Sequence, residues 1–186
     1  MKPQQKVPFK IAVTGTGGSG KTTLAQSLAA DLNLELIPEL ARVVCREQGY
    51  EYPGDISNQE EFKFQLLERQ IKEEAAYQSF VADRCVIDSW VHWQRWNLGS
   101  AMSYDSERFY NIAHEHSRNY THIIYVPPLF APQEDGFRWT DPDYLKQIDR
   151  LIKMTLFDFD LWSKTYTVTS ADSRMRPLEI TKWLES

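Results

Sequence analysis

The chain has few of the features that mark membrane proteins, secreted proteins or proteins that coat nucleic acids. None of its apolar runs approaches the roughly 18 residues that a membrane-spanning helix needs. The formal net charge is −5 at pH 7, whereas a sequence-independent nucleic-acid binder normally presents a basic face. Residues 1–6 lack the apolar stretch of a signal peptide. We therefore expect a cytoplasmic protein with no membrane partner, and we disfavour nucleic acid as its partner.

Cysteine and histidine are scarce as well. The two cysteines, Cys45 and Cys85, are far apart and in no metal-binding spacing, so without a secretory signal we expect free thiols rather than a disulfide. The four histidines form no metal-ligand pattern, and the closely spaced His114 and His116 face different sides of a helix. We therefore predict no metal site built from these two residue types.

The residues that the chain does contain are typical of a globular protein. Apolar residues make up 42% and aromatic residues 13% of its 186 residues, which is enough to bury a full core. There are no internal repeats and no low-complexity tracts. We expect one domain over residues 1–186, with a small lid at about 129–142.

Short apolar runs alternate with amphipathic segments along the chain. The runs predict strands near residues 9–13, 34–37, 80–82, 121–126 and 166–169. The segments predict helices near 22–32, 40–48, 57–77, 106–117, 141–162 and 176–184. Ser57 and Glu60 have the spacing of a capping box at the start of the third of these helices. The alternation indicates a three-layer α/β fold, in which a parallel sheet of about five strands is covered by helices on both faces and the ligand lies beyond the carboxyl ends of the strands.

One strand-to-helix turn carries a phosphate-binding pattern. Residues 15–22 read Gly-Thr-Gly-Gly-Ser-Gly-Lys-Thr, between the first expected strand and the first expected helix. The glycines let the backbone curl around an anion with its N–H groups inward, and the helix N-terminus adds partial positive charge. Lys21 can reach the outer phosphates, and the Thr22 hydroxyl can ligate Mg²⁺. The predicted nucleotide-binding residues are Gly15, Thr16, Gly17, Gly18, Ser19, Gly20, Lys21, Thr22 and Thr23.

Charged residues follow two further strands. Asp83 and Arg84 end the third strand, where a carboxylate can ligate Mg²⁺ and a guanidinium can grip a phosphate; the alternative is a surface ion pair. Glu39 follows the second strand and can act as a base or orient an acceptor hydroxyl, with Arg42 on the same helical face. The alternative for Glu39 is a helix-start residue that the helix dipole favours.

The polar segment before the long 141–162 helix contains Arg138. On a closing lid, this arginine can offset the charge that builds on a transferring group. The alternative is a solvated loop.

Trp90, Trp93 and Trp96 fall on one face of a helix after the third strand. Such a stripe usually belongs to the core. The alternative is a wall on which an acceptor base stacks.

These motifs occur in an order that resembles small P-loop kinases. The phosphate loop, the run at 38–42, the run at 83–89 and the lid motif at 135–138 carry the resemblance. The chain is similar to the ATPase/kinase family that includes the nicotinamide riboside kinase domain and, more loosely, to thymidylate and deoxynucleoside kinases. It lacks the Gly-Gly-Thr extension after Glu39 that thymidylate kinases carry, which disfavours thymidylate as the acceptor.

The resemblance implies cofactors and roles for particular residues. It implies ATP on the phosphate loop, with Mg²⁺ at Thr22 and Asp83. It implies catalytic roles for Lys21, Glu39, Asp83 and Arg138, and acceptor contacts from Glu39, Arg42 and Arg84. We also expect the adenine near residues 169–172.

We therefore expect an ATP- and Mg²⁺-dependent phosphotransferase, a kinase, for a small nucleoside, nucleotide or related metabolite. One alternative is a nucleotide-hydrolysing regulatory switch, although Pro127 and Pro128 stand where an Asn-Lys-x-Asp element for guanine would be. Another is a nucleic-acid end kinase, which the net charge disfavours. The sequence does not distinguish ATP from GTP as the donor, or Glu39 from Asp83 as the base. It also leaves open the acceptor and the oligomeric state, with a homodimer as one option.

Overall fold

The computed structural model describes residues 8–129 and 141–185 of the chain. Within them, one sheet has five parallel strands in the order β2-β3-β1-β4-β5. The strands are β1 (Lys10–Gly15), β2 (Glu35–Ile37), β3 (Phe80–Asp83), β4 (His122–Val126) and β5 (Thr165–Thr167). Because all the pairs are parallel, the carboxyl ends of the strands meet at one edge of the sheet, and the loops that follow them are brought together there.

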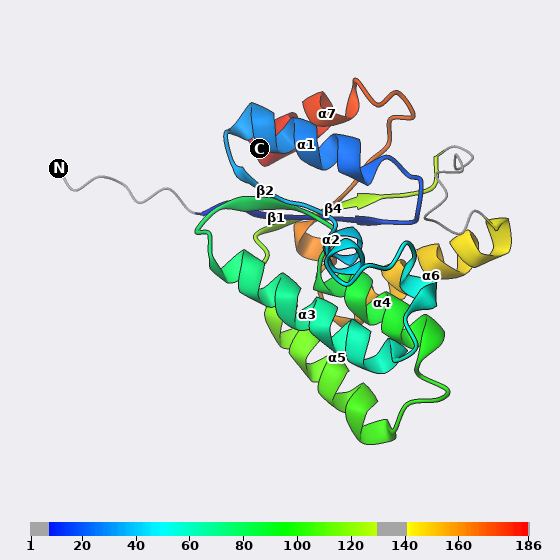
Figure 1. Ribbon diagram of the computed structural model, residues 1–186. Helices are drawn as coiled ribbons and strands as arrows, with labels where there is room; N and C mark the ends of the chain where they lie inside the picture. Colours follow the sequence, from blue (N-terminus) through cyan, green and yellow to red (C-terminus); the bar gives the residue numbers. More distant parts are fainter. Residues whose placement is uncertain (1–7, 130–140, 186) are drawn as a thin grey trace.

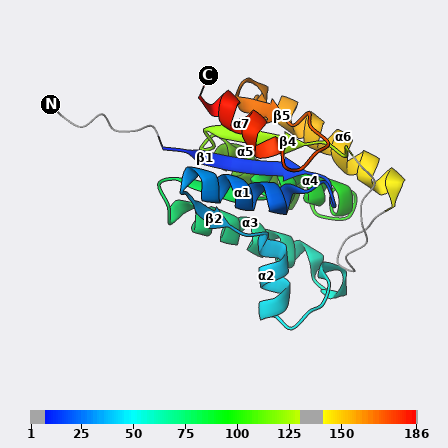
Figure 2. The same ribbon diagram turned by 90° about the horizontal axis from the view of Figure 1, so that it is seen from above.

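Helices cover both faces of this sheet, as Figure 1 shows. On one face lie α1 (Lys21–Leu32) and α7 (Arg176–Leu184). On the other lie α3 (Gln59–Ala75), α4 (Val86–Trp96), α5 (Ser103–Ser117) and α6 (Pro142–Asp158). Helix α2 (Leu40–Glu47) projects beyond the β2 edge, as the view from above shows (Figure 2). Two 3-10 turns, η1 (Pro53–Asp55) and η2 (Trp162–Lys164), lie in the connections. The predicted three-layer α/β fold is confirmed.

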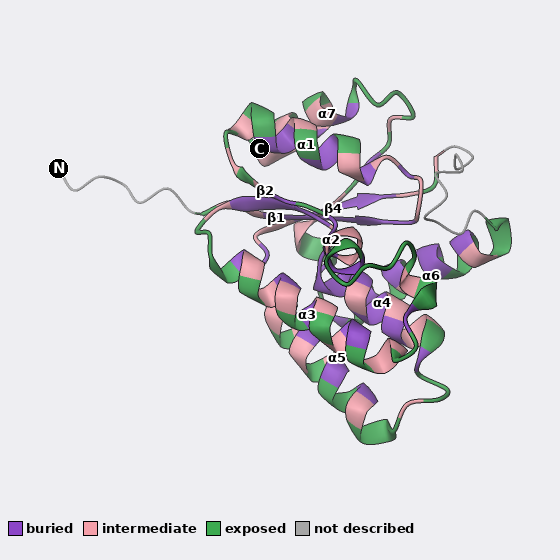
Figure 3. Ribbon diagram, in the orientation of Figure 1, coloured by how far each residue is buried: buried purple, intermediate pink, exposed green. Residues whose placement is uncertain are grey.

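Alternating side chains of β1 enter two different cores. Ile11 and Val13 pack on one face of the sheet with Leu28 of α1 and Ile180 of α7. Ala12 belongs to the larger core under α3 to α6. The central strands β1, β3 and β4 are buried on both faces while the outer sides of the helices are exposed, as Figure 3 shows. This two-sided burial is why these central strands are nearly continuous apolar runs in the sequence.

Some predicted boundaries are wrong. Helix α3 follows Asn58 rather than Ser57, because the Asn58 side chain accepts a hydrogen bond from the Glu61 backbone N–H at 3.2 Å. The helix predicted over 141–162 is α6 followed by η2; Asp160, with a φ of +55°, has the left-handed conformation that interrupts a helix. The last strand occupies 165–167 instead of 166–169.

Three further expectations concern the cysteines, the lid and membrane-spanning helices. Cys45 and Cys85 are buried free thiols, as expected. The predicted lid and its Arg138 fall almost entirely on residues 130–140, outside the described residues. Across the two described stretches, no helix has the length and apolar character needed to cross a bilayer.

Candidate active site

The phosphate loop connects β1 to α1 in a conformation that depends on glycine. A Cβ atom at Gly15 would collide with the carbonyl oxygen of Val126, where β4 ends beside β1. Gly20 precedes α1 with a φ of +89°, in the left-handed region that glycine adopts without strain. The turn therefore presents the N-terminus of α1 at the carboxyl edge of the sheet, which is a favourable place for an anion.

Lys21 is the first residue of α1 and is only 3% exposed. Its ammonium group donates a hydrogen bond to the carbonyl oxygen of Thr16 at 2.5 Å. Burial and then the positive charge of Arg84 lower the pKa of Lys21 to about 7, although nearby carboxylates oppose the shift. A buried ammonium group at the start of this helix has much to gain from a bound phosphate.

Unpaired oxygens line the same turn. The hydroxyl groups of Thr14, Thr16 and Ser19 are buried, and none has a hydrogen-bond partner among the described residues. Since buried polar groups are normally paired, these hydroxyls are consistent with a polar ligand in the loop. Thr23, which the sequence also assigned to nucleotide binding, is exposed at the third position of α1.

Asp83 and Thr22 meet at the end of β3. Burial raises the pKa of the Asp83 carboxyl, while a hydrogen bond with the Thr22 side chain and the positive charge of Arg84 oppose the rise. The Oδ1 atom of Asp83 is buried and has no partner within the described residues. A carboxylate oxygen and a hydroxyl are ligands that Mg²⁺ accepts, so this pair fits the metal that a phosphate loop needs.

Glu39 lies in a cluster of paired charges between the ends of β2 and β3. Its Oε1 atom accepts a hydrogen bond from Arg84 at 2.6 Å, and its Oε2 atom accepts one from Arg42 at 2.9 Å. Arg84 also donates to Asp88 at 2.9 Å. Glu39 is 8% exposed and Asp88 is 3% exposed, so the surface ion-pair alternative for Arg84 does not describe this cluster.

Arg84 is held in an uncommon backbone conformation, with a φ of +78°. Gln70 of α3 donates to the Arg84 carbonyl oxygen at 3.4 Å and to Glu74 at 2.7 Å. Glu74 in turn accepts a hydrogen bond from the Tyr120 hydroxyl at 2.9 Å. This buried network fixes the turn that points Arg84 at Glu39, and no local pattern in the sequence indicated it.

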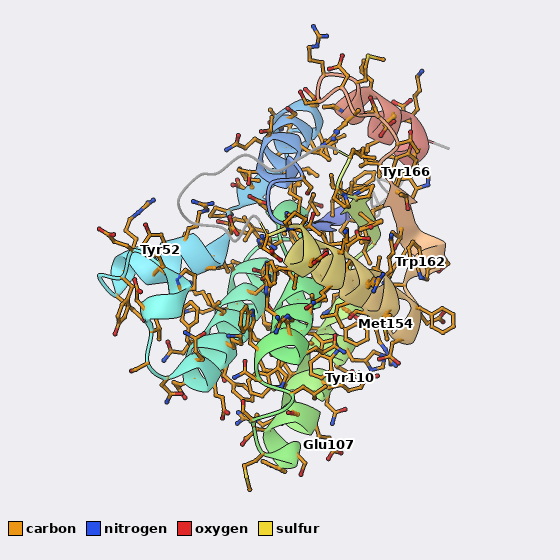
Figure 4. All side chains as sticks on the ribbon, turned by 90° about the vertical axis from the view of Figure 1, so that its right-hand side faces the viewer. Tyr52, Glu107, Tyr110, Met154, Trp162 and Tyr166 are labelled. Atoms are coloured by element: carbon orange, nitrogen blue, oxygen red, sulfur yellow. The ribbon has the colours of Figure 1, made fainter. Side chains whose placement is uncertain are left out.

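A cavity of about 800 Å³ opens between the phosphate loop and α3. Its charged and polar lining residues include Glu39, Gln59, Lys63, Gln70, Arg84, Asp88 and His92. Its apolar and aromatic lining residues include Tyr52, Phe62, Leu66, Trp96, Tyr144 and Ile148. Gly17 of the phosphate loop lines it as well, as does Tyr52, which lies on the α2–α3 connection in Figure 4. The cavity therefore joins the predicted phosphate site to the Glu39 cluster.

The three tryptophans of α4 were predicted either to pack in the core or to form a wall for the acceptor, and they do not all lie in the same environment. Trp90 and Trp93 are buried, and their rings pack against Phe109 of α5. Trp96 is 42% exposed, lines the cavity, and lies 6.0 Å from the ring of Tyr144 between centroids. The core interpretation holds for the first two residues, and the third lies where the acceptor wall was expected.

Arg176 is a buried residue that the sequence gave no reason to select. It is 1% exposed and donates to the carbonyl oxygen of Ser19 at 2.7 Å and to that of Ser170 at 2.9 Å. It thus ties the phosphate loop to the segment after β5 where the adenine was expected. The contact spans 157 positions of sequence, so only the fold brings these groups together.

A family model described as an AAA domain matches residues 10–173. The chain belongs to this AAA domain family. No curated protein matches the chain significantly.

Several solved structures share the fold of this AAA domain chain. NadR in complex with NR is 19% identical with a TM-score of 0.74, covering 94% of this chain and 50% of NadR. Deoxyadenosine kinase from M. mycoides with bound dCTP is 16% identical with a TM-score of 0.71, covering 95% of this chain and 99% of the kinase. Shikimate kinase from Acinetobacter baumannii with shikimate is 15% identical with a TM-score of 0.53, covering 97% and 94%.

The chain spans about half the length of NadR. The predicted resemblance is confirmed for the fold, which the chain shares with NadR and deoxyadenosine kinase, and the family is the AAA domain family.

Proposed function

We propose that this protein is an ATP- and Mg²⁺-dependent phosphotransferase that acts on a small, nucleoside-sized acceptor. The observation that carries the proposal is the cavity of about 800 Å³ that joins Gly17 of the phosphate loop to the Glu39–Arg84 pair. A kinase needs two adjoining sites, one for the polyphosphate and one for the hydroxyl that receives the phosphoryl group. A nucleotide-hydrolysing switch needs no such second site, so the cavity favours the kinase.

The phosphate loop would hold the ATP phosphates, with Lys21 on the outer ones. Thr22 and Asp83 would hold Mg²⁺, which neutralises the negative charge that the phosphates bring together. In the loop itself, the Lys21 ammonium group would leave the Thr16 carbonyl oxygen for a phosphate oxygen. Arg138 stays a proposed lid residue on sequence grounds alone.

Glu39 is the better candidate to orient the acceptor hydroxyl. It lines the cavity, and its two guanidinium partners hold its carboxylate in a fixed direction. Asp83 contacts Thr22, the other proposed Mg²⁺ ligand, so we assign Asp83 to the metal rather than to the acceptor. Phosphoryl transfer needs little proton abstraction before the transition state, so an orienting carboxylate suffices.

The ligands of the structural neighbours agree with a small polar acceptor. NadR is described with NR, deoxyadenosine kinase with dCTP, and shikimate kinase with shikimate. The aromatic rings of Trp96 and Tyr144 in the cavity suit a planar ring, which favours a nucleoside-like acceptor over a cyclohexene acid.

The proposal is tested by ATP turnover with a panel of nucleosides, nucleoside monophosphates and short oligonucleotides. We expect one small-molecule class to stimulate turnover at least about tenfold, and oligonucleotides to have no effect. Lys21→Ala should remove both basal and stimulated turnover with the fold intact by circular dichroism. Slow turnover that no panel member accelerates favours the switch and contradicts the kinase.

A further inference from the structure

Lys63 is a buried positive charge on the wall of the acceptor cavity. It lies on α3, is only 8% exposed, and lines the cavity together with Phe62 and Leu66. Its one hydrogen-bond partner is the Gln59 side-chain oxygen, at 3.0 Å. Within the described part of the chain, no carboxylate lies within ion-pair distance of its ammonium group. An ammonium group taken out of water without a counter-charge is costly, and a bound anion would offset that cost.

The two buried carboxylates of the same cavity, Glu39 and Asp88, are already paired. Glu39 is held by Arg42 and Arg84, and Asp88 is held by Arg84 and by the backbone N–H of Cys85 at 3.2 Å. Asp55 lines the cavity but is exposed and forms no ion pair with Lys63. Glu39 and Asp88 are thus matched by Arg42 and Arg84, and among the described residues Lys63 is left without an ion-pair partner.

Gln59 orients this ammonium group before any ligand arrives. The Gln59 amide nitrogen donates to the carbonyl oxygens of Pro53 at 2.6 Å and Ile56 at 2.8 Å. These bonds direct the Gln59 oxygen at Lys63, so one of the three ammonium N–H groups is used and two remain. A planar carboxylate can accept both of them.

The position of Lys63 separates it from the reacting end of the cavity. Gln70, which contacts the Arg84 carbonyl oxygen, lies seven residues further along α3. Two helical turns correspond to about 10 Å along the axis. His92 also lines the cavity and senses both cations: burial, then the charges of Arg84 and Lys63, lower its pKa to about 3. A molecule with its hydroxyl at Glu39 would therefore meet Lys63 with its opposite end.

We infer that the acceptor carries a single carboxylate on its ring, and that Lys63 binds this carboxylate at the end of the cavity away from the phosphate loop. The inference rests on the proposed function, because it names the acceptor class of that same site. A single ammonium group without an ion-pair partner matches a monoanion better than a phosphate dianion. The same charge disfavours an acceptor whose ring is cationic and carries no carboxylate.

The test is calorimetric binding of two ribosides that differ in one group, nicotinate riboside with a carboxylate and nicotinamide riboside with a carboxamide. We expect the wild-type protein to bind the carboxylate at least about 30-fold more tightly, since an unpaired partner of a buried charge pair is costly. Lys63→Gln should lose this preference, and Lys63→Arg should keep most of it.

The matched control is Lys72→Gln, which removes a positive charge from an exposed position of the same helix and should change neither affinity. Thermal unfolding of each variant shows whether it is folded. Equal wild-type affinities, a preference that survives in folded Lys63→Gln, or no saturable binding of either riboside would overturn the inference.

Failure of the inference can be told from failure of the kinase proposal. Mg²⁺- and ATP-dependent phosphorylation of a neutral nucleoside, with no preference for a carboxylate, leaves the kinase standing and removes the role of Lys63. Carboxylate binding that depends on Lys63, without any phosphoryl transfer, supports the anion site and contradicts the kinase.

Discussion

The protonation of Lys21 should make the free energy of unfolding of the ligand-free protein depend on pH. Burial lowers its pKa from 10.5 to about 7 in the folded chain. Between these two values the unfolded chain binds more protons than the folded one, so the Lys21 contribution to stability rises with pH above about 7 and is lost as pH falls through it. The slope is at most about 1.4 kcal/mol per pH unit.

Urea unfolding at pH 7 and pH 9 measures this contribution. We expect the free energy of unfolding to rise less between these pH values in Lys21→Met than in the wild type, and Lys72→Met to behave as the wild type does. The same rise in Lys21→Met and the wild type would show that the ammonium group is not buried as described.

Glu39→Gln separates an orienting role from a helix-start role. The amide keeps the size of the side chain but removes the charge that holds Arg42 and Arg84 and orients a hydroxyl. We expect turnover to fall about 100-fold or more, with ATP affinity within about twofold because the phosphate loop is untouched. Steady-state kinetics and ATP titration measure the two quantities. An unchanged catalytic rate means that Glu39 only begins α2.

At the scale of elements, a buried hydrogen-bond network joins α3, α4 and the turn before β4. The Tyr120 hydroxyl accepts from the backbone N–H of Val86 at 3.1 Å and donates to Glu74 at 2.9 Å. Tyr120→Phe leaves both groups buried without this partner, and we expect a loss of about 1–3 kcal/mol in the free energy of unfolding. Tyr77→Phe, at a position 38% exposed, is the control. Equal stabilities of the two variants in urea would contradict the network's role.

Local signals in the sequence predict most of the elements. The glycine-rich residues 15–20 and the apolar strands are recognised from patterns only a few residues long. For this reason β1, the phosphate loop and α1 could be predicted together. The start of α3 was misplaced by one residue, because Ser57 and Asn58 are both good caps and the choice depends on the following turn.

The acceptor side could be predicted only in part. Glu39, Arg42 and Arg84 follow strand ends, and parallel strands bring such positions together. Lys63, Gln70 and His92 lie on helices, and the packing of α3 and α4 decides which helical face meets the cavity. Periodicity alone places Trp90, Trp93 and Trp96 on one face; it does not tell that the last of them extends beyond the core.

At the scale of the whole molecule, Mg²⁺-ATP should stabilise the fold. A ligand that binds only the folded state at 100 times its dissociation constant adds about 2.7 kcal/mol, which raises the melting temperature of a chain of this size by about 5–10 °C. Differential scanning fluorimetry measures the shift. Lys21→Ala should show little of it, whereas an unshifted wild type at saturating Mg²⁺-ATP would argue against a nucleotide site.

The central claim is that the phosphate loop and the cavity beside it form one phosphoryl-transfer site. The most direct measurement follows the γ-phosphoryl group of labelled ATP in the presence of Mg²⁺ and a ring-carboxylate riboside. We expect the label on the riboside hydroxyl, in amounts equal to the ADP formed, and none in Lys21→Ala. Label found only in inorganic phosphate, at a rate that no acceptor on the panel changes, would contradict the claim.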